Sequence, residues 1–342
     1  MSRVTRPVHV APTIVFLDGL TGTGKTMLGP LVGSLARVEV LRIEHTYEYL
    51  CEMHHLGRME LDAATALLGM YADLACYDTM IARNTNFRFS DLSGVWSNPG
   101  ALRYLRRLRM PDGNVVSKRI AEEKPILQVL THQALCAMGA AFTAYSERVR
   151  VIEALRHPLF LLEHWLTYID RHGEDPRDFT IWIEHDGRAL PWFASGWEER
   201  YVGSPTFDRV IYTVDHMMRA SDAFIAALPQ AARAQVLEVP FEPFVFDPEP
   251  WMQKIADLLG TQTTPVTSKV MREQKVPRTL IAAGPAKDIY RRYGWKAPDA
   301  GQTERSEYEA KRELAVKNAS PEALEVLDTL SAEYEQRWGR WF

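Results

Sequence analysis

The sequence is poor in cysteine and has no excess of basic charge. Its three cysteines, Cys51, Cys76 and Cys136, are scattered along the chain, which argues against a disulfide framework or a cysteine-rich zinc site. Lysine and arginine number 40 against 44 aspartates and glutamates, a formal net charge of −4. No overall basic field is therefore present for general nucleic-acid binding. We expect free thiols in a reducing compartment.

Long apolar runs are missing as well. No stretch approaches the 18 consecutive apolar residues that a membrane-spanning helix needs, and the first ten residues are too short and polar for a signal peptide. We therefore expect a cytoplasmic protein without a membrane span. With 342 residues, of which 46% are hydrophobic and 25% charged, the chain has the composition of an ordinary globular protein.

Short β-branched runs alternate with stretches of helical periodicity over much of the chain. Strands are expected at 13–18, 38–43, 125–130, 149–154 and 236–239. Alternating strands and helices build a parallel sheet, so we predict an α/β fold with helices on the sheet. We interpret 1–342 as one domain, with a helical insertion over 46–120 and a helical C-terminal extension over 261–342. Between two aromatic runs, Asp186-Gly187 predicts a hairpin turn.

The sharpest motif is a complete phosphate-binding loop. The pattern G-x-x-x-x-G-K-[ST] is met by Gly19-Leu20-Thr21-Gly22-Thr23-Gly24-Lys25-Thr26, which follows a predicted strand and opens a predicted helix. Backbone amides from Gly22 to Met27 would surround phosphate oxygens, with the dipole of the helix behind them. Lys25, solvated when no ligand is bound, would reach the terminal phosphates, and the Thr26 hydroxyl would ligate Mg²⁺. A glycine-rich turn without a ligand is the alternative.

The segments that follow resemble the P-loop sulfotransferases, which use 3′-phosphoadenosine 5′-phosphosulfate. Ile126–His132 is similar to a family strand that ends in a Thr-His pair, and 149–158 to a strand followed by an Arg-x-Pro turn. The segment 236–260 is similar to a later strand and helix of the family. The resemblance spans roughly 13–260. It implies a P-loop fold, His132 as the catalytic base, and Arg156 as a ligand of the donor's 3′-phosphate.

The loop departs from that family where the donor is bound. Gly22 stands where the family usually has a basic residue, Lys25 where it has a small hydroxyl residue, and His164 where a serine helps to hold the 3′-phosphate. We interpret the loop as rebuilt for a nucleoside triphosphate. The leading hypothesis is phosphoryl transfer, dependent on ATP and Mg²⁺, to a hydroxyl of a small molecule or glycan. The alternative is metal-free sulfuryl transfer, with Lys25 polarising the leaving phosphate. A non-catalytic nucleotide switch is the third possibility.

Phosphoryl transfer needs positioned charges and a base at the acceptor hydroxyl. Glu44 follows the second predicted strand and His132 the third, at the sheet edge where open α/β folds bind ligands, so either residue could be that base. His45 is a weaker candidate. Arg156 could hold a donor phosphate in either reaction. The ordinary alternatives are a solvated acid, a hydrogen-bonded histidine and a surface arginine.

Two later polar segments are more typical of solvent-exposed surface than of a functional site. The segment 170–178 contains two arginines and could be a moving lid, but a solvated loop is the simpler interpretation. The cluster of Arg272, Lys275 and Arg278 lies where the resembled family has its last donor loop. We interpret it as a solvated run of charge.

Overall fold

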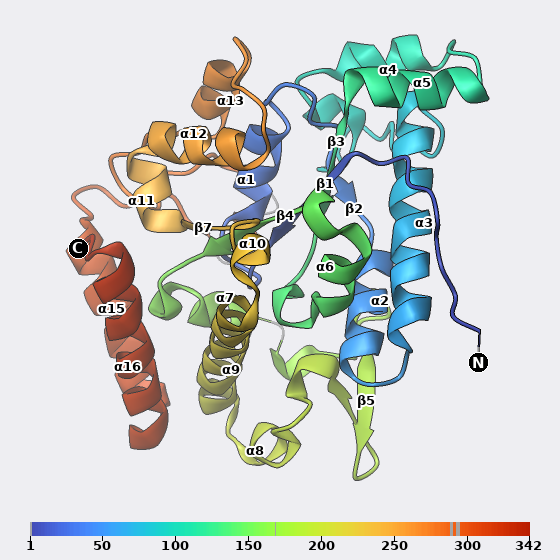
Figure 1. Ribbon diagram of the computed structural model, residues 1–342. Helices are drawn as coiled ribbons and strands as arrows, with labels where there is room; N and C mark the ends of the chain where they lie inside the picture. The colour runs from blue at the N-terminus through green and yellow to red at the C-terminus, as the bar shows by residue number, and fades with distance from the viewer. Residues whose placement is uncertain (1, 168, 288–289, 292–294) are drawn as a thin grey trace.

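The computed structural model describes residues 2–167, 169–287, 290–291 and 295–342. At its centre lies a five-stranded parallel sheet in the order β2-β3-β1-β4-β7 (Figure 1). The strands are β1 (Thr13–Asp18), β2 (Arg42–Ile43), β3 (Ile126–Leu130), β4 (Val149–Leu155) and β7 (Val236–Pro240). The predicted α/β class, a parallel sheet flanked by helices, is confirmed.

Both faces of the sheet are covered by helices, as the alternation within β1 requires. Val15 and Leu17 face one core cluster, whereas Ile14 and Phe16 face the other. The first core is closed by α1 (Lys25–Val32), α11 (Phe241–Phe246), α12 (Pro248–Leu258) and α13 (Thr267–Glu273). The opposite face carries α2 (Thr46–His55), α3 (Leu61–Met80), α6 (Gly139–Tyr145), α7 (Leu162–Leu166), α9 (Thr206–Ala227) and α16 (Pro321–Trp338).

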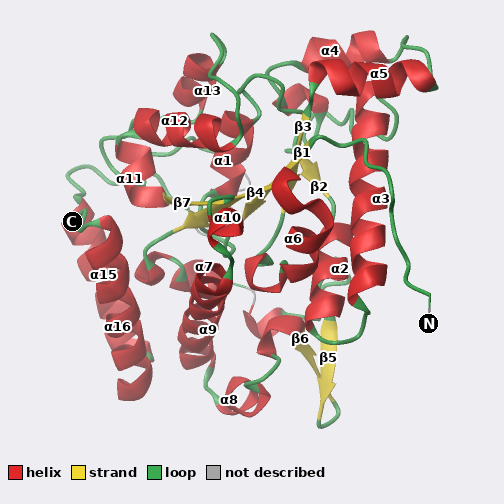
Figure 2. Cartoon of the chain, in the orientation of Figure 1, coloured by secondary structure: helices red, strands yellow, loops and turns green. Residues whose placement is uncertain are grey.

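Shorter helices and a hairpin complete the molecule. The helices are α4 (Ala101–Arg107), α5 (Asn114–Glu123), α8 (Glu198–Gly203), α10 (Gln230–Arg233) and α15 (Glu304–Asn318). The predicted hairpin is confirmed: β5 (Trp182–His185) pairs antiparallel with β6 (Arg188–Pro191), away from the main sheet (Figure 2). Asp186 and Gly187 have φ angles of 48° and 74°, as a tight hairpin turn requires. Among the described residues, no helix is long and apolar enough to cross a membrane.

The second strand is shorter than the predicted 38–43. After an isolated bridge from Val38 to Ile126, the backbone amide of Val40 donates to the hydroxyl of Tyr104 on α4 at 2.6 Å. The buried carboxylate of Glu39 accepts a hydrogen bond from Arg107 at 2.6 Å. These contacts with α4 take the chain out of the sheet until Arg42. A local sequence pattern does not reveal such long-range contacts, so the sequence predicts a longer strand.

Helices α2 to α5 separate β2 from β3 in the chain, over the stretch that we interpret as an insertion. That interpretation, like the assignment of 261–342 as an extension, stays a prediction. Helix α16 begins as expected, because the Ser320 side chain accepts a hydrogen bond from the Ala323 amide at 3.2 Å.

Candidate active site

The loop between β1 and α1 is shaped by three glycines. Gly19, Gly22 and Gly24 have φ angles of 127°, 99° and 98°, which other residues rarely adopt. A Cβ at Gly24 would lie 2.5 Å from the ring of Phe241, and one at Gly19 would overlap the carbonyl oxygen of Ala154. The loop therefore fits closely against its neighbours as it enters α1, where backbone amides and the helix dipole favour a phosphate.

Asp18 connects this loop to the end of the neighbouring strand β3. Its buried carboxylate accepts hydrogen bonds from the backbone amides of Ala134 at 3.1 Å and Leu135 at 2.7 Å. The Gln133 amide also donates to the carbonyl oxygen of Gly19 at 3.2 Å. These contacts fix the segment that contains His132 beside the phosphate-binding loop.

Lys25 folds back beneath the loop. Its ammonium group donates a hydrogen bond to the carbonyl oxygen of Gly19, and the residue is only 6% exposed. Burial lowers the pKa of Lys25, while the carboxylates of Asp18 and Glu153 oppose that shift. The expectation that Lys25 is solvated without a ligand is therefore wrong. The positive charge lies inside the protein, next to carboxylates that compete for it.

The remaining residues expected at the donor lie in different surroundings. Thr26 is half-buried in the first turn of α1. The Met27 side chain packs in the core. The imidazole of His164 lies against Gly22, where an added Cβ would approach it to 3.3 Å. Burial, followed by the charge of Arg156, lowers the pKa of His164 to about 4.

Two arginines share one aromatic ring beside the loop. The guanidinium carbons of Arg156 and Arg278 lie 4.8 and 5.5 Å from the ring centroid of Phe241. Arg156 donates to the carbonyl oxygen of Gly22 at 2.9 Å, and Arg278 contacts the sulfur of Met27 in α1 at 3.3 Å. Both arginines therefore border the N-terminal end of α1, although they are far apart in the sequence.

The positive charge at this ring is poorly neutralised. Arg156 has Glu242 at 3.9 Å, and no carboxylate in the described part of the chain lies within ion-pair distance of Arg278. Burial lowers the pKa of Arg278 to about 10, and the charge of Arg156 adds to the shift. The interpretation of Arg278 as part of a solvated run is wrong, whereas Arg272 and Lys275 are exposed as expected. An anion at this place would relieve the repulsion between the two guanidinium groups.

His132 is held by a buried carboxylate at the end of β3. Glu48, from α2, accepts hydrogen bonds from the backbone amide and from Nδ1 of His132, both at 3.0 Å. The other oxygen of Glu48 lies 3.1 Å from Nδ1 of His45, whose ring stacks on His132 with a centroid separation of 5.3 Å. Burial opposes the ionisation of Glu48, but the charges and hydrogen bonds of the two histidines outweigh it and lower its pKa.

Glu44 lies in a different environment. Its carboxylate contacts the guanidinium group of Arg42, with the Nε at 2.9 Å. His45, in turn, has its pKa raised by the hydrogen bond to Glu48, although burial opposes the shift. Nδ1 of His132 is engaged by Glu48, which leaves Nε2 for a substrate proton. The two candidate bases thus differ in their partners: Glu48 holds His132, and Arg42 holds Glu44.

Sequence reasoning missed Glu48 and Phe241 in this region, and it named Arg278 only as part of a solvated run of charge. Glu48 had a usable signal, because it is an acid in the first turn of a predicted helix directly after a predicted strand. Phe241 had no such signal, since its contacts depend on how α11 folds back onto α1. Arg278 had one, because its cluster lies where the resembled family has its last donor loop.

Comparisons with known proteins give a distant likeness. No protein-family model matches the chain. No curated protein matches its sequence either. Three of the similar solved structures are sulfotransferases or sulfotransferase domains. That of the curacin biosynthetic pathway is 12% identical, covers 88% of this chain and 98% of its own, and has a TM-score of 0.41.

The sulfotransferase domain of the olefin synthase of Synechococcus PCC 7002 is 13% identical, covers 93% of this chain and 100% of its own, and has a TM-score of 0.39. A Mycobacterium avium sulfotransferase is 12% identical, covers 97% of this chain and 78% of its own, and scores 0.41. At scores below 0.5 these likenesses assign no residue role, so the chemistry below is inferred from the contacts of this chain alone.

Proposed function

We propose that this protein transfers a sulfuryl group from 3′-phosphoadenosine 5′-phosphosulfate to an acceptor hydroxyl. The observation that carries the proposal is the pair of guanidinium groups, Arg156 and Arg278, at the ring of Phe241. The pair forms an anion site in addition to the phosphate-binding loop, and both sites border the same end of α1. A donor with a 3′-phosphate and a 5′-phosphosulfate carries anions for both sites, whereas a simple triphosphate needs only the loop.

The surroundings of Thr26 fit a donor that needs no metal. The strand beside β1 continues as Leu130-Thr131-His132, without the carboxylate that commonly helps to hold Mg²⁺ in P-loop enzymes. Asp18, the nearest acid in the sequence, already accepts two backbone amides. Sulfuryl transfer requires no metal, so this donor suits the residues that are present.

The proposed reaction gives roles to His132 and Lys25. As sulfur–oxygen bond formation proceeds at the acceptor, the bond between sulfur and the bridging oxygen breaks, and adenosine 3′,5′-bisphosphate leaves. His132 takes the proton of the acceptor hydroxyl at Nε2, while Glu48 orients the ring through Nδ1 and stabilises the imidazolium. Lys25 and the loop amides offset the negative charge that develops on the leaving phosphate.

Phosphoryl transfer from ATP is a second candidate, favoured by one specific observation. Lys25 and Thr26 complete the pattern that binds a triphosphate and its Mg²⁺ in P-loop kinases. In that reaction the paired arginines would have no assigned anion. The two candidates therefore differ in whether Arg278 contributes to donor binding.

The experiment that tests the proposal is a calorimetric titration of adenosine 3′,5′-bisphosphate into wild type and two arginine variants. Arg278→Ala should weaken binding roughly 10- to 100-fold, the usual loss for a charged hydrogen bond. Arg272→Ala is the matched control, because that arginine is exposed on α13, and its affinity should stay within about twofold of wild type. Equal affinity of all three proteins would refute the proposal.

A further inference from the structure

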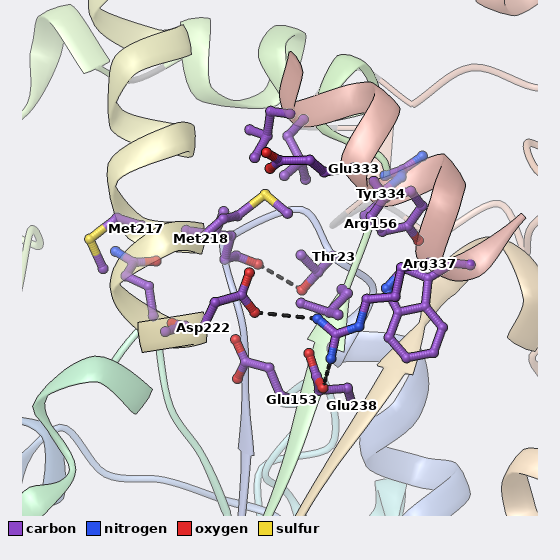
Figure 3. A pocket seen from close by; sticks show the side chains of 18 of the residues that line it. Thr23, Glu153, Arg156, Met217, Met218, Asp222, Glu238, Glu333, Tyr334 and Arg337 are labelled. Carbon is purple, nitrogen blue, oxygen red and sulfur yellow. Dashed lines mark hydrogen bonds and ion pairs between the residues drawn. The ribbon is translucent and has the colours of Figure 1, made fainter. Parts of the chain in front are cut away.

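A second hollow lies beside the phosphate-binding loop, and Arg156 is among the residues that line it. It encloses about 80 Å³ between the carboxyl ends of β4 and β7, helix α9 and helix α16 (Figure 3). Leu20 and Thr23 of the phosphate-binding loop form part of its wall. Apolar side chains from both helices contribute to the wall, including Met218, Ile225 and Leu330. The proposed function assigns a role to Arg156 among these residues but none to the carboxylates of the pocket.

Acidic side chains enter the pocket from adjacent strands. Asp18 on β1, Glu153 on β4 and Glu238 on β7 are partners in the register of the parallel sheet, so their side chains leave the same face in one row. Glu153 and Glu238 line the pocket, and Asp222 reaches it from α9. Glu333 of α16 is a fourth lining carboxylate, and Figure 3 shows Arg337 extending from α16 toward Asp222 and Glu238.

Arg337 neutralises only part of this charge. It binds Asp222 at 3.3 Å and one oxygen of Glu238. Oε1 of Glu238 and Oε2 of Glu153 are buried and have no hydrogen-bond partner among the described residues. Glu153 is only 4% exposed. A buried carboxylate oxygen without a hydrogen-bond donor destabilises the folded protein. A ligand that donates a hydrogen bond to this oxygen would remove that destabilisation.

The ammonium group of Lys25 does not fully compensate the buried carboxylate of Glu153. Burial raises the pKa of Glu153 well above its usual range, and Asp18 raises it further, although Lys25 opposes both. Lys25 is itself bound to the carbonyl oxygen of Gly19, and the proposed function draws it toward the donor phosphate. An additional cation is therefore the complement that the pocket lacks.

We infer that this pocket binds the primary ammonium group of an organic amine, with N–H donors directed to Glu153 and Glu238. The short apolar walls accommodate the first carbons of the amine's chain. Donors are essential to this recognition, because both unpartnered oxygens are hydrogen-bond acceptors. A quaternary ammonium group carries the charge without the N–H bonds and fits less well. The inference goes beyond the proposed function and does not depend on which donor the loop binds.

Calorimetric titration of the full chain with n-butylamine tests this inference. 1-Butanol is the neutral control, and n-butyltrimethylammonium carries the charge without donors. We expect the amine to bind at least tenfold more tightly than either control. Glu153→Gln, which keeps the shape and loses the charge, should weaken amine binding at least tenfold. Glu325→Gln, at an exposed position of α16, should leave it within about twofold of wild type.

Filling the pocket provides a test that does not alter its charges. Ile225→Trp, in the wall formed by α9, should abolish amine binding even if Glu153→Gln fails to fold. Equal binding of amine and butanol, or unchanged binding in Ile225→Trp, would overturn the inference, as would the absence of any amine binding. These titrations contain no nucleotide. Amine binding by a protein that ignores adenosine 3′,5′-bisphosphate would therefore contradict the proposed function alone.

Discussion

One carboxylate oxygen of Glu48 accepts two hydrogen bonds from His132, one from its backbone amide and one from its imidazole, each at 3.0 Å. The first contact fixes the chain at the end of β3, and the second fixes the ring on that chain. Because Glu48 is itself buried in α2, the imidazole has one defined orientation. This is how a positioned base is expected to look before a substrate arrives.

The first prediction compares the two candidate bases. His132→Asn should lower turnover by a factor of about 10² to 10⁴, the usual contribution of a general base, with little change in nucleotide affinity. Glu44→Gln should change turnover no more than about threefold, because the Glu44 carboxylate is engaged by Arg42. Steady-state kinetics with a saturating donor measures both. A large loss in Glu44→Gln with a small one in His132→Asn would reverse the assignment.

The second prediction concerns Lys25. Lys25→Met should lower turnover by roughly 10² to 10³, the typical effect of losing one preorganised electrostatic partner. It should also change how stability depends on pH, because the buried charge of Lys25 opposes the raised pKa of Glu153. An acid whose pKa is raised by folding binds more protons in the folded chain, so its contribution to stability falls as pH rises.

Removal of Lys25 should therefore steepen the loss of stability as pH rises above the ordinary glutamate pKa of about 4.3. Thermal unfolding across that range measures the effect. Lys269→Met is the matched control, since that lysine is exposed on α13 and pairs only loosely with Glu273 at 3.8 Å. Parallel curves for Lys25→Met and wild type would show that Lys25 does not interact with Glu153.

The third prediction concerns stability in acid. The pKa of His164 is lowered to about 4 by burial and then by Arg156, from an ordinary value of 6.5. Between these values the unfolded chain binds a proton that the folded chain does not, so stability is lost as pH falls from 6.5 to about 4. At about 1.4 kcal/mol per pKa unit, His164 accounts for roughly 2–3 kcal/mol of that loss.

His164→Gln removes this titration. Urea unfolding at pH 7 and pH 4.5 should show an acid-induced loss that is smaller than in wild type by about that amount. An identical loss in both proteins would mean that His164 titrates in the folded chain as it does in the unfolded one.

The fourth prediction separates two glycines. Gly24→Ala should destabilise the protein by about 1–3 kcal/mol or more, because φ is 98° and the new methyl group meets Phe241 at 2.5 Å. Gly203→Ala, in α8, meets nothing within 4 Å and should be neutral or stabilising by up to about 1 kcal/mol. Chemical unfolding of both variants measures the difference. Equal stabilities would show that Gly24 is not needed for the shape of the loop.

The sequence predicts local features of this protein well and distant contacts poorly. The glycine-rich loop between β1 and α1, the hairpin turn at Asp186-Gly187 and the N-cap at Ser320 depend on adjacent residues, so their patterns are visible in the chain. The shortened β2 depends on Tyr104, more than 60 positions away. The pairing of Arg156 with Arg278 depends on the packing of both around Phe241, which no local pattern encodes.

The central claim is that the donor carries a second phosphate for Arg156 and Arg278. The most direct test is calorimetric titration of the wild-type chain with adenosine 3′,5′-bisphosphate and with ATP, each with and without Mg²⁺. Our account predicts that the bisphosphate binds at least tenfold more tightly than ATP and that Mg²⁺ leaves its affinity unchanged. Tight binding of ATP only with Mg²⁺, together with weak binding of the bisphosphate, would contradict it.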